Sequence, residues 1–311
     1  MKRLVIFTFV VSALMLQAAT INSQFVSKKA VWVAHIDIDS VKDPQSKLGS
    51  WMMEQSFKDA ASRKLAALEV ILGMDLRKDI SGITAYGLSQ GDKKSAAILT
   101  GNFDIERLTT LLAGADNYTL EIVAGYAIHS WDSKKKQGKR AYASLCDSGK
   151  IAFASDSETL VHALMVLDGK ESNAVGIELM KIAAGKTMIV AAFDSPIPLE
   201  WPKAGALKMA QAGAFSIAEN DDQVAIEFVL ETTEKEKAEN ICRVAEGMKA
   251  MAMLGADKNP QAADFAKMMV VEKQENAVAI SLICPTEKVI KMMQAAADRK
   301  RSARMDKMDN K

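Results

Sequence analysis

The segment Ala30–Asp39, which reads AVWVAHIDID, constrains the fold of this chain more than any other. Apolar residues alternate with other residues along it, and a period of two predicts a strand with one buried face. A similar strand returns at Thr187–Asp194, where VAAFD stands in place of the VAHID of the first strand. This echo predicts that the chain contains one folding unit twice.

The elements predicted after each of these strands come in the same order, namely a helical connection, a hairpin, a helix, a second hairpin and a closing helix. Units of this kind favour antiparallel sheets. We therefore expect an α+β fold with two related halves, each a mainly antiparallel sheet with helices packed on one face. The expected segments are a signal peptide (1–20), a first repeat (30–170), a linking helix (171–186), a second repeat (187–297) and a charged tail (298–311).

Period-two patterns and turn residues predict the remaining strands. They are expected at Ile80–Leu88, Ser95–Gly101, Tyr118–Val123, Tyr126–Trp131, Ala141–Cys146, Lys150–Ala154, Ala212–Ala218, Gln223–Thr232, Met268–Lys273 and Ala277–Cys284.

Capping signals predict where several helices begin. Asp104 is placed to cap a short helix, and capping-box spacings occur at Ser155–Glu158 and at Thr233–Glu236. A longer helical pattern runs from about Gln45 to Met74.

The N-terminus has the pattern of a secretory signal. The basic pair Lys2-Arg3 precedes an apolar run from Leu4 to Leu16, and small residues follow at positions 18–20. The run is shorter than the roughly 20 residues that span a bilayer, although an uncleaved membrane anchor is the alternative interpretation. We expect an exported protein, periplasmic or extracellular, with no integral membrane segment once the signal is removed.

Charge and cysteine content limit the classes of partner and site. A formal net charge of +1 with 25% charged residues is typical of a soluble globular protein and gives no reason to expect nucleic acid as a partner. Cys146, Cys242 and Cys284 are an odd number without a C-x-x-C pair, so neither a redox motif nor a zinc pair is indicated. We expect three buried thiols, with a Cys242–Cys284 disulfide as the alternative.

The first strand carries the best constellation of chemically active side chains. His35, Asp37 and Asp39 point to one face of it, but alternate residues of a strand lie about 6.6 Å apart. Ala192 stands where the second copy would need a histidine, so no duplicated metal site is supported. Asp37 and Asp194 fit better as caps of the turn that leaves the strand, and we expect no metal and no cofactor.

Catalytic motifs are absent from the sequence, and whether the chain is an enzyme stays open. His129 stands beside Trp131 in a predicted strand without a visible nucleophile, and His162 falls on a helix whose face we expect to be solvated. There is no G-x-S-x-G, P-loop, G-x-G-x-x-G or H-E-x-x-H sequence. A site assembled from distant residues leaves no local trace.

Two segments are candidates for contact with a partner. The helix predicted at Ala238–Leu254 carries more methionine than one narrow buried stripe needs, and methionine-rich surfaces adapt to partners. We favour a helix buried on two sides between the repeats, with an exposed contact surface as the alternative. Trp201 lies in the proline-rich segment Pro196–Pro202 and serves either as a contact anchor or as a plug over the sheet.

One short motif carries a resemblance to a group of proteins. The sequence Gly101-Asn102-Phe103-Asp104, after a strand that includes Ile83–Gly87, resembles uncharacterised exported bacterial proteins in which a strand ends in G-x-F-D before a helix. That resemblance covers the first half of the chain and implies no activity.

The sequence therefore predicts an exported envelope protein that binds a partner protein or a small ligand without catalysis. The alternatives are a hydrolase with a dispersed active site, for which His35 or His129 would serve, and a subunit of a homo-oligomer that uses the methionine-rich helix.

Overall fold

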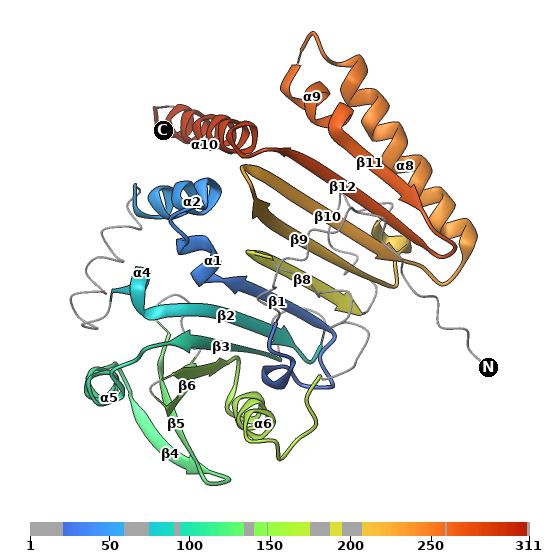
Figure 1. Cartoon of the computed structure of the whole chain (residues 1–311). Helices are drawn as coiled ribbons and strands as arrows, with labels where there is room; N and C mark the ends of the chain where they lie inside the picture. The colour runs from blue at the N-terminus through green and yellow to red at the C-terminus, as the bar shows by residue number, and fades with distance from the viewer. Residues whose placement is uncertain are drawn as a thin grey trace.

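The computed structural model describes residues 21–58, 75–89, 94–133, 140–147, 149–174, 187–194, 207–258 and 260–309. Within these ranges twelve strands form one continuous antiparallel sheet, in the order β11-β12-β10-β9-β8-β1-β2-β3-β7-β6-β5-β4 (Figure 1). The sheet confirms the predicted α+β class. The strands are β1 (Trp32–Asp37), β2 (Ile80–Gly87), β3 (Ser95–Gly101), β4 (Thr119–Val123), β5 (Tyr126–Asp132), β6 (Arg140–Asp147), β7 (Lys150–Ala154), β8 (Ile189–Asp194), β9 (Ala212–Asn220), β10 (Gln223–Glu231), β11 (Met269–Lys273) and β12 (Ala277–Pro285).

The two strands that echo each other in sequence are neighbours at the middle of the sheet. β1 and β8 pair antiparallel, with Ala34 opposite Ala191 and His35 opposite Val190. Outward from this pair the strands follow the same order on both sides, β1-β2-β3-β7-β6 on one and β8-β9-β10-β12-β11 on the other. The expected halves thus share one sheet, and their origin by duplication stays a prediction.

The helices are α1 (Ile38–Lys42), α2 (Lys47–Lys58), α4 (Leu76–Asp79), α5 (Ile105–Ala113), α6 (Ser157–Leu167), α8 (Lys235–Leu254), α9 (Pro260–Met268) and α10 (Thr286–Asp309), with short 3-10 helices at Ser23–Phe25 and Leu207–Met209.

Helices pack on both faces of the sheet, so the expectation of a single covered face is wrong. Leu108 of α5 packs with Leu99 of β3, whereas Leu160 of α6 packs with the preceding residue Ile98. Consecutive strand residues point to opposite faces, which places α5 and α6 on opposite sides. A strand buried on both faces needs apolar residues at successive positions, and β3 has them.

The start of β1 follows the prediction but its end does not. The strand stops at Asp37, whose carboxylate accepts hydrogen bonds from the backbone N–H of Ser40 (3.0 Å) and from its hydroxyl (2.6 Å). An aspartate in this position caps a helix, and α1 begins at once. Both faces of β1 are also covered in part, since Val33 on the face of His35 is fully buried.

The capping signal was correct at α5, displaced by one residue at α6, where Asp156 and not Ser155 is the cap, and wrong at α8. Asp104 accepts a hydrogen bond from the Arg107 N–H at the start of α5, and Asp156 does the same for Thr159 at the start of α6. α8 follows Glu234, which makes no side-chain capping bond, so the Thr233–Glu236 box does not form. The Thr233 hydroxyl instead accepts a hydrogen bond from Lys237.

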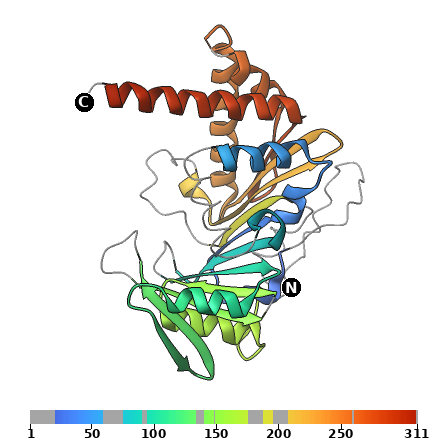
Figure 2. The same cartoon turned by 90° about the vertical axis from the view of Figure 1, so that its left-hand side faces the viewer.

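The final helix is longer than predicted. α10 continues through the expected charged tail as far as Asp309, and Figure 2 shows it extending past α2 and away from the sheet. The helix expected from Gln45 to Met74 is described only at Lys47–Lys58, and the expected linking helix lies almost wholly outside the described residues. No helix in the described ranges is both long enough and apolar enough to cross a membrane.

Candidate functional site

The polar side chains of β1 and of the start of α1 form hydrogen bonds and salt bridges with neighbouring residues of the protein. The Nδ1 atom of His35 lies 2.9 Å from the Thr84 hydroxyl on the neighbouring strand. Burial lowers the pKa of His35, while the nearby Asp37 carboxylate partly opposes that change. Asp37 is buried and caps α1, and Asp39 forms a salt bridge with Lys42 (2.9 Å). The three side chains therefore do not share one site.

His129 is a buried residue of β5 in contact with the ring of Tyr118. Its Nδ1 atom lies 2.9 Å from the Tyr118 hydroxyl, and burial lowers the pKa of the imidazole. The hydrogen bond to the phenol engages one ring nitrogen, and no carboxylate is bonded to this ring among the described residues.

His162 approaches a serine, which the sequence did not suggest. Its Nε2 atom lies 2.9 Å from the hydroxyl of Ser27, and its pKa is lowered by burial and by Lys29. Ser27 is 0% exposed, and its oxygen also accepts the Lys29 N–H. A nucleophile must reach its substrate, and a fully buried hydroxyl does not. The contact ties the N-terminal segment to α6.

The remaining sequence candidates are placed as follows. Trp201 lies outside the described residues. All three cysteines are free thiols, but only Cys284 is buried, Cys242 is partly buried and Cys146 is exposed, so the expectation of three buried thiols is wrong. Within the described ranges no three His, Cys, Asp or Glu side chains are arranged to hold a metal ion.

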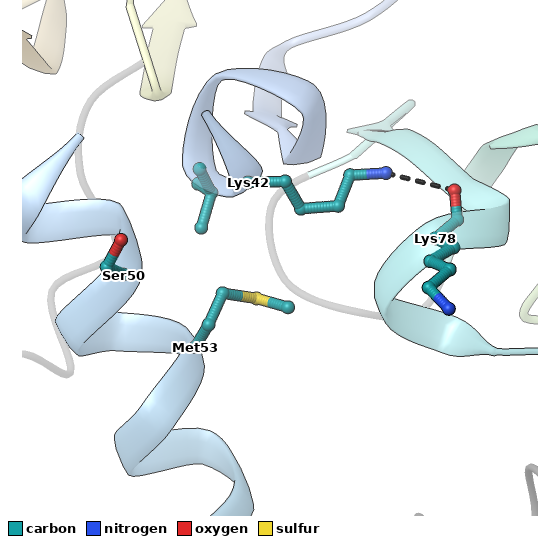
Figure 3. Close-up of a pocket in the computed structure, with 5 residues that line it drawn as sticks. Lys42, Ser50, Met53 and Lys78 are labelled. Carbon is teal, nitrogen blue, oxygen red and sulfur yellow. Dashed lines mark hydrogen bonds between the residues drawn. The ribbon is translucent and has the colours of Figure 1, made fainter. Parts of the chain in front are cut away.

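An open cavity of about 460 Å³ lies between α1, α2 and α4 (Figure 3). Val41 and Met53 form its apolar wall, and Lys42, Ser50 and Lys78 form its polar side. The Lys42 ammonium donates to the carbonyl oxygens of Lys78 (3.1 Å) and Ile80 (2.8 Å). Its charge is balanced by Asp39, and that of Lys78 by Asp75 (3.3 Å). The cavity therefore offers no excess charge to a ligand.

A smaller polar cavity of about 140 Å³ lies where the β9–β10 turn meets the start of α2. Glu219 lines this cavity, and its carboxylate accepts hydrogen bonds from the Ser46 hydroxyl and the Leu48 N–H. A carboxylate at a helix N-terminus stabilises the helix. Glu219 thus holds α2 against the sheet.

The strongest candidate site is a second apolar face on α8. One face of this helix carries the buried residues Ala238, Ile241 and Ala245, and the helix packs against β11, β12 and α9. A different set lies toward solvent, with exposed fractions of 44% for Val244, 67% for Met248, 74% for Met251 and 86% for Leu254. Residues three and four apart share a helix face, so these four form one stripe. We call them, with Gly247, the α8 stripe.

This stripe corrects the interpretation of α8 as buried on two sides. α8 lies at the outer end of the sheet beside β11 and packs against β11, β12 and α9, while the side that carries the α8 stripe stays exposed (Figure 1). The sequence drew attention to this helix through Met248, Met251, Met253 and Leu254, but Val244 and Gly247 were not singled out. Their spacing, separate from that of Ala238, Ile241 and Ala245, is the signal that finds a second face.

Gly247 lies in the middle of the α8 stripe. A side chain built there would meet nothing within 4 Å, so packing inside this chain does not require a glycine. Glycine in a helix interior costs about 1 kcal/mol relative to alanine. Its absent side chain leaves a gap beside Met248.

Comparison with known proteins gives the fold but no family. No family model matches the chain, and no curated protein matches it in sequence. A protein designated TP0453 is similar in structure. Its crystal form III has a TM-score of 0.50 at 8% identity, covering 88% of this chain and 97% of that chain. Crystal form IV has a TM-score of 0.49 at 8% identity, covering 87% and 95%. At such identity the likeness shows the α+β fold alone.

Proposed function

We propose that this chain is an exported protein of the cell envelope that acts by binding another polypeptide and not by catalysis, with the α8 stripe as its contact surface. One observation carries the proposal. α8 has 20 residues, one face packed on the sheet and a second apolar face that no described residue covers. Contiguous exposed apolar side chains of this kind mark contact sites.

Export rests on the sequence of residues 1–20, which has the basic, apolar and small-residue regions of a secretory signal. The non-catalytic part of the proposal is supported by the roles of the candidate residues. Asp37 caps a helix, His35 and His129 bond to Thr84 and Tyr118, and the Ser27 hydroxyl near His162 is fully buried.

The occupant that best fits the α8 stripe is α8 of a second copy. An antiparallel pair centred between Gly247 and Met248 would set Val244 against Met251 of the other copy and Met248 against the gap at Gly247. The central contacts then join apolar side chains to each other or to the gap, while Leu254 lies at the end of the paired segment. Such an arrangement is the self-complementary patch that a two-fold dimer requires, and close helix pairs have axes 8–10 Å apart.

Sedimentation velocity of the mature protein over a wide concentration range tests this function. We expect a concentration-dependent dimer that Met251→Glu weakens roughly tenfold or more, because a carboxylate buried in an apolar contact loses its hydration. Met253→Glu is the matched control, since Met253 is on the same helix, is exposed and lies off the stripe. Equal dimerisation of both variants, or a wild-type monomer without any partner, would contradict the proposal.

A further inference from the structure

The far end of the sheet from α8 has an open edge. β4 is the last strand in the sheet order, and within the described residues it pairs on one side only, with β5 (Figure 1). Ala124 (φ 52°) and Gly125 (φ 86°) form the two-residue turn between these strands, and the positive φ values are those of a type I′ turn. No bulge interrupts the five residue pairs of the hairpin.

This turn fixes which backbone groups of β4 point outward. Val123 and Tyr126, which flank the turn, form a hydrogen-bonded pair, and such pairs alternate along an antiparallel ladder. Thr119 and Glu121 therefore bond to β5, and the N–H and C=O groups of Leu120 and Ile122 point away from the sheet. These two residues thus present two donors and two acceptors to an incoming strand.

The side chains of the same two residues form an apolar surface. Leu120 is 50% exposed and Ile122 is 70% exposed, and both lie on one face of the sheet. Glu121 points to the other face, is exposed, and forms no salt bridge in the part of the chain that the structure describes. An incoming strand would find apolar contacts on one face and one negative charge on the other.

The charge of Glu121 disfavours β4 of a second copy of the protein as the incoming strand. A two-fold pairing centred on this residue would join Leu120 to Ile122 of the other copy, but it would also set the two Glu121 carboxylates directly opposite each other. That position belongs to a non-hydrogen-bonded pair, in which side chains are closest, and like charges there are destabilising. A lysine or arginine at the same position would be favoured instead.

We propose that β4 is a docking edge for an extended peptide segment with an apolar–basic–apolar sequence, which adds a thirteenth strand to the described sheet. Its backbone would bond to Leu120 and Ile122, its basic side chain would face Glu121, and its two apolar side chains would lie beside those of Leu120 and Ile122. Addition of a strand to an exposed edge is a recurrent mode of peptide recognition. The site is distinct from the α8 stripe, at the other end of the sheet.

Fluorescence anisotropy with labelled peptides tests the proposal on the mature protein. The probe is an alternating valine–threonine peptide with one central lysine between valines, and the matched probe has glutamate in place of the lysine. We expect the lysine peptide to bind more tightly by about 2- to 30-fold, because cross-strand charge pairs stabilise or destabilise by similar amounts. Glu121→Lys should reverse the preference without changing the fold, as judged by circular dichroism.

A second variant separates edge pairing from simple charge attraction. Ile122→Pro removes an outward N–H that the β4–β5 ladder does not use, and edge strands tolerate proline at such positions. It should abolish binding of both peptides. Equal binding of the two peptides to wild type, no binding of either, or undiminished binding to Ile122→Pro would overturn the proposal. A wild-type dimer that Ile122→Pro disrupts would show that β4 pairs with itself, and would overturn it as well.

Discussion

Replacement of Glu219 by glutamine should weaken the attachment of α2 to the sheet. The carboxylate accepts the Leu48 N–H at 3.0 Å and the hydroxyl of Ser46, which are the first groups of α2 that need an acceptor. Glutamine keeps the size of the side chain but carries no charge and offers one acceptor oxygen in place of two.

The size of the effect follows from these contacts. A hydrogen bond to a charged group contributes about 1.5–3 kcal/mol, and a carboxylate at a helix N-terminus contributes about 0.3–1 kcal/mol more. Because Glu219 is only partly buried, we expect Glu219→Gln to lower the free energy of unfolding by about 2 kcal/mol. Trp51 of α2 packs against the apolar cluster that contains Leu48 and Met188. Its fluorescence therefore reports the unfolding of this part of the protein.

Urea denaturation followed by tryptophan fluorescence is the assay, with Glu227→Gln as the matched control. Glu227 is a partly buried glutamate on the adjacent strand β10, and no hydrogen bond or salt bridge is recorded for it among the described residues. If Glu219→Gln is no more destabilising than Glu227→Gln, the role given to the Glu219 carboxylate is wrong.

Three further predictions concern the core, the histidines and the cysteines. Leu160→Ala should lower the free energy of unfolding by about 2–5 kcal/mol, because the side chain is fully buried, whereas Leu120→Ala on the open edge should change it by less than about 0.5 kcal/mol in urea titrations. Burial lowers the pKa of His35, His129 and His162, so the unfolded chain binds more protons than the folded chain below pH 6.5. Stability should therefore fall as pH decreases below 6.5, and His129→Gln should reduce that slope in denaturation curves; a slope of opposite sign would refute the assignment. A thiol reagent should modify Cys146 before Cys284, because Cys146 is exposed and Cys284 is buried, while burial raises the pKa of both thiols, that of Cys146 to about 11; modification of Cys284 ahead of Cys146 in mass spectra would contradict this.

Local sequence signals predicted the strands well because each strand is bounded by its own turn. β3 and β7 have the predicted bounds, Ser95–Gly101 and Lys150–Ala154. At the end of β1 the alternation continued to Asp39, but the helix cap at Asp37 ended the strand two residues earlier. A hydrogen bond between a side chain and a nearby N–H prevailed there over the apolar pattern.

Tertiary placement was harder to predict than the elements themselves. The apolar content of α8 fits equally well with a helix buried on two sides and with a helix at a sheet end that has one free face. The choice depends on where β11 lies in the sheet order, and strand order is set by long-range pairing. The open edge of β4 was missed for the same reason, although its hairpin was predicted.

The α8 stripe is tested most directly by the distance between two copies. A spin label attached at Ala250→Cys, which is exposed on α8 and lies off the α8 stripe, with the three native cysteines replaced by serine, reports this distance by double electron–electron resonance. We expect a short distance between copies at this position, because paired helices have axes 8–10 Å apart, and a long one for the same label at Ile122→Cys on β4. A long or undetectable distance at position 250, or a short one at position 122, would contradict the account.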